Sequence, residues 1–188
     1  YFFQKNGMPF VKARFQNVYG PREILGAGKW RGTQHTVWRN VIPTFIFKSL
    51  NNEALPLDNG GKGTRDFIFV EDIVKGLIQC ALIGNPGEAY NLASGKETSV
   101  HELAKLINSI TGNTTPLDLK KPRDWDKSGK RFGSTIKSKE FINFEAEVEI
   151  DEGLNKTIEW TKNNLDLIKK TMAKHQNNLK EVKQYLNN

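Results

Sequence analysis

The stretch GKGTRDFIFVEDI, residues 61–73, carries the pattern that decides the fold. Four consecutive apolar residues at 67–70 predict a short buried strand, and a glycine-rich turn precedes them. Apolar residues at 73, 74, 77, 78 and 81 then follow the period of an amphipathic helix. A strand that leads straight into a helix indicates α/β architecture. Neither element requires the charged pair Arg65–Asp66 at the start of the strand, so the pair points to a further role.

Short strands and helices alternate on both sides of this stretch. Such alternation is typical of an α/β domain, and long polar loops at residues 24–43 and 114–134 separate the elements. Asp72 is the expected N-cap of the central helix, and Ser99 with Glu102 occupies capping-box positions before another helix. The patterns predict strands at 9–15, 65–70 and 88–95, and helices at 44–54, 71–84, 99–112, 138–144 and from about Asp151.

The composition is that of a globular protein, with 37% hydrophobic and 26% charged residues. A single cysteine, Cys80, excludes a disulfide framework and is consistent with a reducing compartment, so we expect the cytoplasm. No apolar run is long enough to cross a bilayer, and we expect no membrane partner. Much of the net charge of +7 comes from lysines that alternate with apolar residues after position 161, a pattern typical of a solvated helix face. We therefore expect no nucleic-acid partner.

Several motifs in the sequence lack the spacing that their chemistry requires. GAGKW (26–30) and GGKGT (60–64) contain no phosphate-loop motif, and the three histidines lie in no metal-ligand spacing with the cysteine. The sequence therefore predicts no metal site.

Polar side chains at strand ends and in the long loops form the candidate binding set. Carboxamides, helix-start amides and arginines bind phosphate oxygens, and a carboxylate binds ribose hydroxyls. Together these side chains fit a nucleoside diphosphate, although each one alone is equally well explained as a turn, cap or solvated loop residue. The set consists of Asn17, Asn40, Arg65, Arg123 and Asp126.

Seven motifs follow one another in order along the chain: ARFQNVYGPRE, NVIPTFIFKSL, GTRDFIFVEDIVKGL, AYNLASGKETSVHELAKLI, PRDWD, SKEFINF and DEGLNKTIEW. Their order and spacing resemble the C-terminal half of the extended short-chain dehydrogenase/reductases, and the resemblance covers residues 7–161. These are NAD-dependent nucleotide-sugar epimerases and dehydratases, and the long loop is similar to those of enzymes from O-antigen clusters. The resemblance implies the C-terminal part of a Rossmann-type protein, in which a small mixed α/β substrate-binding domain carries long loops.

The resemblance assigns a role to each candidate residue. It implies that Asn17 contacts a substrate phosphate, and that Asn40, the backbone amide of Val41 and Arg65 contact the diphosphate. It also implies that Arg123 and Asp126 bind phosphate and ribose. One extra residue after Asp126 makes Arg131 a competitor for the anion.

The same resemblance implies which parts of the enzyme lie elsewhere. The catalytic Tyr-x-x-x-Lys motif of the family lies upstream of the position of Gly7, so the matching spacing of Tyr1 and Lys5 is coincidental. We expect residues 1–161 to be the substrate-binding part, residues 162–188 to be a helical extension, and NAD to be bound mainly by an N-terminal half absent from this chain. The resemblance implies no catalytic residue within this chain, and the chain alone is expected to be inactive. The full-length enzyme is expected to be a homodimeric epimerase or dehydratase in lipopolysaccharide and surface-polysaccharide precursor synthesis.

Two alternatives remain open from the sequence. One is a non-catalytic relative of the same fold that binds a nucleotide sugar or RNA. The other is a basic interaction domain whose C-terminal helix, residues 163–187, docks on a partner. We expect the apolar stripe of that helix to pack against its own domain instead.

Overall fold

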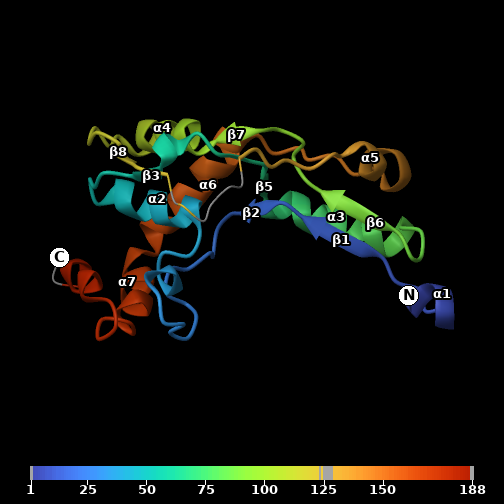
Figure 1. Ribbon diagram of the computed structural model, residues 1–188, viewed down its shortest axis with the longest axis horizontal. Helices are drawn as coiled ribbons and strands as arrows, with labels where there is room; N and C mark the ends of the chain where they lie inside the picture. Colours follow the sequence, from blue (N-terminus) through green and yellow to red (C-terminus); the bar gives the residue numbers. More distant parts are fainter. Residues whose placement is uncertain (1, 123, 125–128, 187–188) are drawn as a thin grey trace. The chain divides into compact units, whose positions relative to one another are not determined.

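The computed structural model describes residues 2–122, 124 and 129–186, which form two compact units (Figure 1). The first unit contains the described residues within 1–20, 57–103 and 119–153, and the second contains those within 21–56, 104–118 and 154–188. Each unit has its own buried apolar cluster. Segments far apart in the sequence therefore come together within each unit.

Strands and helices alternate in the first unit from residue 67 onward, as the sequence pattern predicts. The elements β3, α4 and β8 each extend into the second unit by at least one residue. In chain order the elements are α1 (Phe2–Asn6), β1 (Lys12–Phe15), β2 (Asn17–Tyr19), β3 (Pro56–Asp58), β4 (Thr64–Arg65), β5 (Phe67–Phe69), α3 (Val70–Ile83), β6 (Ala89–Leu92), β7 (Thr98–Ser99), α4 (Val100–Thr111), β8 (Asp118–Lys120) and α5 (Ile136–Ile142).

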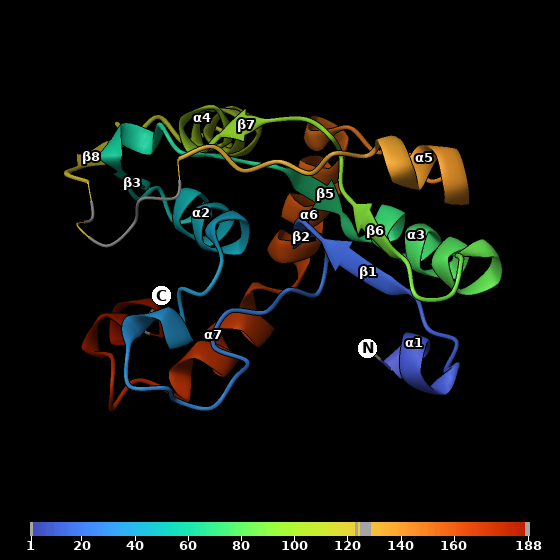
Figure 2. The ribbon, with the colours of Figure 1, turned by 45° about the vertical axis from the view of Figure 1, so that its right-hand side comes forward.

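The strand that runs from β1 into β2 changes its partner at Gln16. β1 pairs in parallel with β6, whereas β2 pairs in parallel with β5. The backbone N–H of Gln16 donates to the carbonyl of Leu92 (3.2 Å), and that of Asn17 donates to the carbonyl of Asp66 (2.9 Å). The elements β5, α3 and β6 form a strand–helix–strand connection, and Figures 1 and 2 show α3 beside β1 and β6. This arrangement confirms the predicted α/β class.

The core of the first unit lies between these parallel strands and helices α3 and α5. Gly76 of α3 permits a close approach, because a Cβ atom there would lie 2.8 Å from side-chain atoms of both Leu92 and Phe144. The glycine thus lets the helix pack directly on the sheet. The buried residues of the cluster are Ile68, Ile73, Cys80, Tyr90, Leu92, Ile142 and Phe144.

The start of α3 differs from the sequence prediction. Asp72 is predicted as the N-cap, but the N-cap is Phe69, because the buried strand passes into the helix without a turn. Asp72 lies in the first helical turn, where a carboxylate interacts favourably with the helix dipole, and its Oδ2 accepts from the Val148 N–H (3.1 Å). The predicted capping box of α4 is confirmed, because Glu102 accepts from the Ser99 N–H (2.9 Å) and donates its own N–H to the Ser99 hydroxyl (3.1 Å).

The second unit is mostly helical and contains the predicted long loop. The loop has one short 3-10 turn. The helix predicted at residues 44–54 spans residues 41–50 instead. It can begin before Pro43 because proline is accepted in the first turn of a helix. The helix predicted from about Asp151 is confirmed. The elements are η1 (Gln34–Thr36), α2 (Val41–Leu50), α6 (Ile150–Asn163, which begins in the first unit), α7 (Leu165–Ala173) and η3 (Lys180–Tyr185).

The continuous helix predicted over residues 163–187 is wrong. α6 ends at Asn163, α7 ends at Ala173, and a series of turns leads to the short η3. The break lets the last residues fold onto the loop before α2, so the expected packing of the apolar stripe within its own unit is confirmed. The buried cluster consists of Leu25, Val37, Phe47, Ile168, Met172, Val182 and Tyr185.

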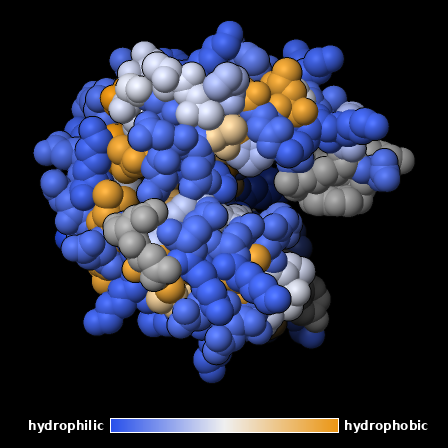
Figure 3. Space-filling view, turned by 90° about the vertical axis from the view of Figure 1, so that its left-hand side faces the viewer, coloured by the Kyte–Doolittle hydropathy of each residue, from blue (hydrophilic) through white to orange (hydrophobic). Residues whose placement is uncertain are grey.

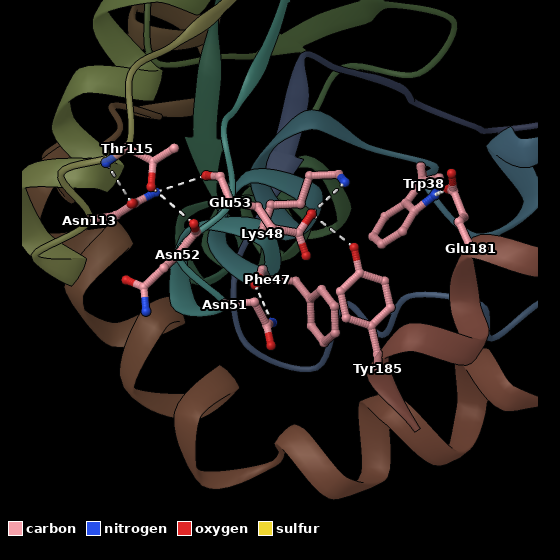
Figure 4. A network of polar contacts seen from close by, with 10 residues as sticks. All are labelled: Trp38, Phe47, Lys48, Asn51, Asn52, Glu53, Asn113, Thr115, Glu181 and Tyr185. Atoms are coloured by element: carbon pink, nitrogen blue, oxygen red, sulfur yellow. Dashed lines mark hydrogen bonds and ion pairs between the residues drawn. The ribbon is translucent and has the colours of Figure 1, made fainter. Parts of the chain in front are cut away.

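Polar contacts hold the end of the chain to α2 (Figure 4). The Glu53 carboxylate accepts from the Tyr185 hydroxyl (2.9 Å) and pairs with the Lys48 ammonium (3.0 Å). The Trp38 indole N–H donates to the Glu181 carboxylate, and the Trp38 ring packs edge-on against Tyr185. These contacts join the loop, α2 and η3 into one packed region.

Candidate functional site

Asp66 has a structural role in the charged pair Arg65–Asp66. Its side chain is fully buried, and its carboxylate accepts from the Ser94 N–H (2.8 Å), the Ser94 hydroxyl (2.7 Å), the Gly95 N–H (2.9 Å) and the Gly133 N–H (3.2 Å). Four donors account for most of the lone pairs of one carboxylate. Asp66 therefore ties the segment after β6 and the segment before α5 to the start of β5.

Arg65 lies in β4, immediately before this buried carboxylate. β4 pairs antiparallel with β7, which places Arg65 opposite Thr98. The Arg65 Nη1 donates to the carbonyls of Thr64 (2.7 Å) and Gly129 (3.3 Å), and the residue is half-buried. Its guanidinium is thus held at the surface of the first unit by backbone acceptors.

Asn17 is brought close to the same segment by strand pairing. It opens β2 opposite Phe67, and its backbone N–H donates to the Asp66 carbonyl (2.9 Å). The residue is exposed, and its carboxamide makes no hydrogen bond to any part of the chain that the structure describes. The pairing of β2 with β5 therefore places Asn17 beside Asp66, the residue that follows Arg65, and the sequence did not establish this.

Asn40 and Val41 lie in the second unit, at the start of α2. Asn40 is the N-cap, and its Nδ2 donates to the Glu23 carboxylate instead of capping the helix. Burial raises the pKa of the Glu23 carboxyl, while the hydrogen bond from Asn40 and the charge of Arg39 oppose that rise. The first backbone bond of the helix runs from the Thr44 N–H to the Asn40 carbonyl, so the Val41 N–H has no acceptor within the helix.

The structure does not add the remaining sequence candidates to this set of residues. Arg123, Asp126 and Tyr1 lie outside the described residues, Lys5 lies in α1, and Arg131 is exposed. Within the described ranges, no group of His, Cys, Asp and Glu side chains could hold a metal ion.

The long loop before α2 is held by the C-terminal tail. The His175 Nε2 lies 2.9 Å from the Gly26 carbonyl, and the His175 ring lies beside Trp30, with the ring centroids 5.9 Å apart. Gly26 has a φ of +70°, and a Cβ there would lie 3.0 Å from the Met172 Cα. Only glycine suits this position, so the loop and α7 are closely fitted.

Comparison with known proteins gives a consistent result. The family described as the NAD dependent epimerase/dehydratase family matches residues 1–93. The crystal structure of the Bordetella bronchiseptica enzyme WbmF in complex with NAD+ and UDP superposes with a TM-score of 0.87 at 60% sequence identity, over 96% of this chain and 54% of that chain.

The chain resembles members of the NAD dependent epimerase/dehydratase family over nearly its whole length. The resemblance found in the sequence is thereby confirmed, and so is the Rossmann-type fold that it implies.

Two further relatives support this resemblance to the epimerase/dehydratase family. The epimerase Mth375 from Methanothermobacter thermautotrophicus has a TM-score of 0.80 at 40% identity, over 90% of this chain and 48% of that chain. The UDP-N-acetyl-alpha-D-glucosaminuronate decarboxylase of Bacillus cytotoxicus is 30% identical over 159 residues, which is 82% of this chain and 46% of that protein. This chain therefore spans about half the length of the relatives it matches.

Sequence reasoning missed several residues that hold the candidate binding residues and their neighbours in place. Ser94, Gly95 and Gly133 bind Asp66 through backbone amides, which leave no signature in a sequence. Glu23 binds Asn40 across seventeen positions of an irregular loop. The only available signal was the presence of a carboxylate beside the turn at Gly20–Pro21.

Proposed function

We propose that this chain supplies nucleotide-sugar-binding residues of an NAD-dependent sugar epimerase or dehydratase. The observation that carries the proposal is the 60% identity, over nearly the whole chain, to WbmF, which was solved with NAD+ and UDP. The similarity covers 96% of this chain, so it is not confined to a single motif.

The residues of the first unit suit a phosphate of the nucleotide. Asn17 is exposed at the start of β2, and the Arg65 guanidinium is held by two backbone carbonyls. Arginine binds phosphate oxygens through charge-assisted, bidentate hydrogen bonds. The buried Asp66 carboxylate accepts four hydrogen bonds, and these hold the chain between β4 and β5 in place.

The residues of the second unit provide backbone and amide donors. The start of α2 presents the Val41 N–H at the positive end of the helix dipole, which favours a negatively charged group. Asn40 keeps its carboxamide oriented through Glu23. We also propose that Arg123 and Asp126 contact phosphate and ribose, as the family resemblance implies.

NAD, when bound, accepts and returns the hydride of the sugar carbon in this class of reaction. The sequence contains no G-x-G-x-x-G turn, so we assign no NAD contact to this chain. The role of its residues is to bind and orient: contacts to the remote nucleotide position the sugar for the reaction. The nucleotide-sugar product would be a donor for surface-polysaccharide synthesis. A homodimeric state and a cytoplasmic location remain predictions.

Hydrophilic residues cover most of the face drawn in Figure 3. Among the described residues, no helix is both long and apolar enough to cross a membrane.

A thermal-shift screen of UDP, dTDP and GDP sugars on the full-length protein tests the proposal. A ligand that binds only the native state raises the midpoint of unfolding. We expect at least one nucleotide sugar to raise it in a concentration-dependent manner, whereas the free sugars should not. No shift with any of the three nucleotide classes would contradict the proposal.

A further inference from the structure

The loop before α2 forms an open surface pocket, called the loop cavity below, that the nucleotide-binding residues do not line. This loop cavity lies within residues 24–39, has a volume of about 280 Å³, and includes neither Asn40 nor Val41 in its lining. Figures 1 and 2 show the loop beside α7. The side chains and backbone that matter for its chemistry belong to Gly28, Lys29, Arg31, Thr33, His35 and Arg39.

The charge of the loop cavity is entirely positive. Lys29, Arg31 and Arg39 line it, and no Asp or Glu does. The described part of the chain places no carboxylate within 4.0 Å of the Lys29 ammonium or the Arg31 guanidinium. Arg39 interacts electrostatically with Glu23, which lies outside the lining. Like charges that line one pocket repel one another, and a bound anion would reduce that repulsion.

Hydrogen bonds hold the residues that line the cavity in place. The Arg31 N–H donates to the Thr36 hydroxyl (3.0 Å), and the Thr36 N–H donates to the Thr33 carbonyl (3.0 Å). On the other side, the His175 ring nitrogen contacts the Gly26 carbonyl at 2.9 Å. The cavity is therefore formed before any ligand arrives, which lowers the entropy cost of binding.

We propose that the loop cavity is an anion site, separate from the nucleotide site, that binds a phosphate or carboxylate group. Lys29 and Arg31 supply charge-assisted hydrogen bonds to its oxygens. The Thr33 hydroxyl and the Gly28 backbone complete a polar lining. The anion is either free phosphate or an anionic group carried by the sugar nucleotide, and the latter source rests on the proposed function.

Calorimetric titration of the full-length protein with inorganic phosphate tests the site. The titration is made with saturating UDP, so that the nucleotide site is filled, and repeated without UDP. If phosphate is the ligand, Lys29→Gln/Arg31→Gln should weaken its binding by at least about tenfold, as expected from lost charge-assisted bonds. Lys162→Gln/Lys180→Gln removes the same charge from exposed positions and should leave phosphate binding unchanged.

A second titration compares UDP-glucuronate with UDP-glucose and identifies the source of the anion. If the anion is a carboxylate on the sugar, the cavity variant loses affinity for UDP-glucuronate and keeps its affinity for UDP-glucose. If only phosphate binding falls, the anion is free phosphate.

Three results would overturn the proposal. In the first, the cavity variant and the control variant weaken anion binding equally. In the second, the cavity variant binds phosphate and UDP-glucuronate as tightly as the unaltered protein does. In the third, the cavity variant loses affinity for UDP-glucose and UDP-glucuronate alike, which would place these cations in the nucleotide site. UDP binding by the unaltered protein is measured in the same series. The series therefore distinguishes a loop cavity that binds no anion from a protein that binds no UDP, which would contradict the proposed function.

Discussion

At the scale of single residues, Asp66 and Asn40 show what the sequence could and could not predict. Their chemical types were recognised as informative, because a buried carboxylate and a strand-end or helix-start amide each require partners. The identity of the partners depended on segments 28 to 67 positions away for Asp66, and on Glu23 for Asn40. Backbone amides of Ser94, Gly95 and Gly133 have no sequence signature, so the role of Asp66 as their common acceptor emerged only from the fold.

Replacement of Asp66 by Asn should lower the stability of the protein markedly. The carboxamide cannot accept from all four donors, and each buried donor left without a partner costs about 1–3 kcal/mol. We expect the free energy of unfolding in urea to fall by about 3 kcal/mol or more. Glu140→Gln, which removes an exposed carboxylate from α5, is the matched control and should change stability by less than about 0.5 kcal/mol. Equal midpoints for the two variants would contradict the structural role of Asp66.

Glu23 should make stability depend on pH. Burial raises the pKa of its carboxyl in the folded protein, so the folded state holds this proton more tightly than the unfolded state. The stability contributed by the protonated form is present below the unfolded pKa and is lost as pH rises through the folded pKa. Glu23→Gln keeps an acceptor for Asn40 without the charge. We therefore expect the variant to gain stability relative to the native protein at pH 7 and to gain none at pH 4. The thermal midpoints at both pH values check this, and a gain at pH 4 alone would contradict it.

At the scale of elements, local patterns predicted where most helices and strands lie, because apolar periodicity and capping are short-range effects. The capping box of α4 and the strand–helix passage from β5 to α3 are examples. The failures depend on long-range packing. Residues 163–187 have a helical stripe, but the chain turns after α7 so that Val182 and Tyr185 can cover Phe47. The change of partner at Gln16 is likewise set by β5 and β6, which lie far along the chain.

Tyr185 tests whether the tail is an integral part of the second unit. The residue is 3% exposed, packs against Trp38 and Phe47, and donates to Glu53. Tyr185→Ala should lower the free energy of unfolding by about 3–5 kcal/mol through the cavity it leaves. Tyr185→Phe removes only the hydroxyl and should cost about 1 kcal/mol. Urea unfolding of both variants gives the comparison, and a Tyr185→Ala variant as stable as the native protein would show that the tail is dispensable.

At the scale of the whole molecule, the sequence predicted the fold family because several motifs occur in a fixed order over residues 7–161. No single motif was sufficient, since glycine turns and Arg–Asp pairs are common. The fold follows from the joint pattern and from the identity to WbmF. The separation into two units was not predictable, because it depends on which distant segments share a core.

The central claim is that residues of this chain bind the nucleotide of a nucleotide sugar, and Arg65 gives the most direct test of it. Calorimetry should measure the Kd of UDP for the full-length protein and for Arg65→Ala, with NAD binding measured on the same samples. Loss of a bidentate, charge-assisted contact should weaken UDP binding by at least about tenfold. NAD affinity should stay unchanged. An unchanged Kd for UDP, or no UDP binding by the native protein, would contradict the account.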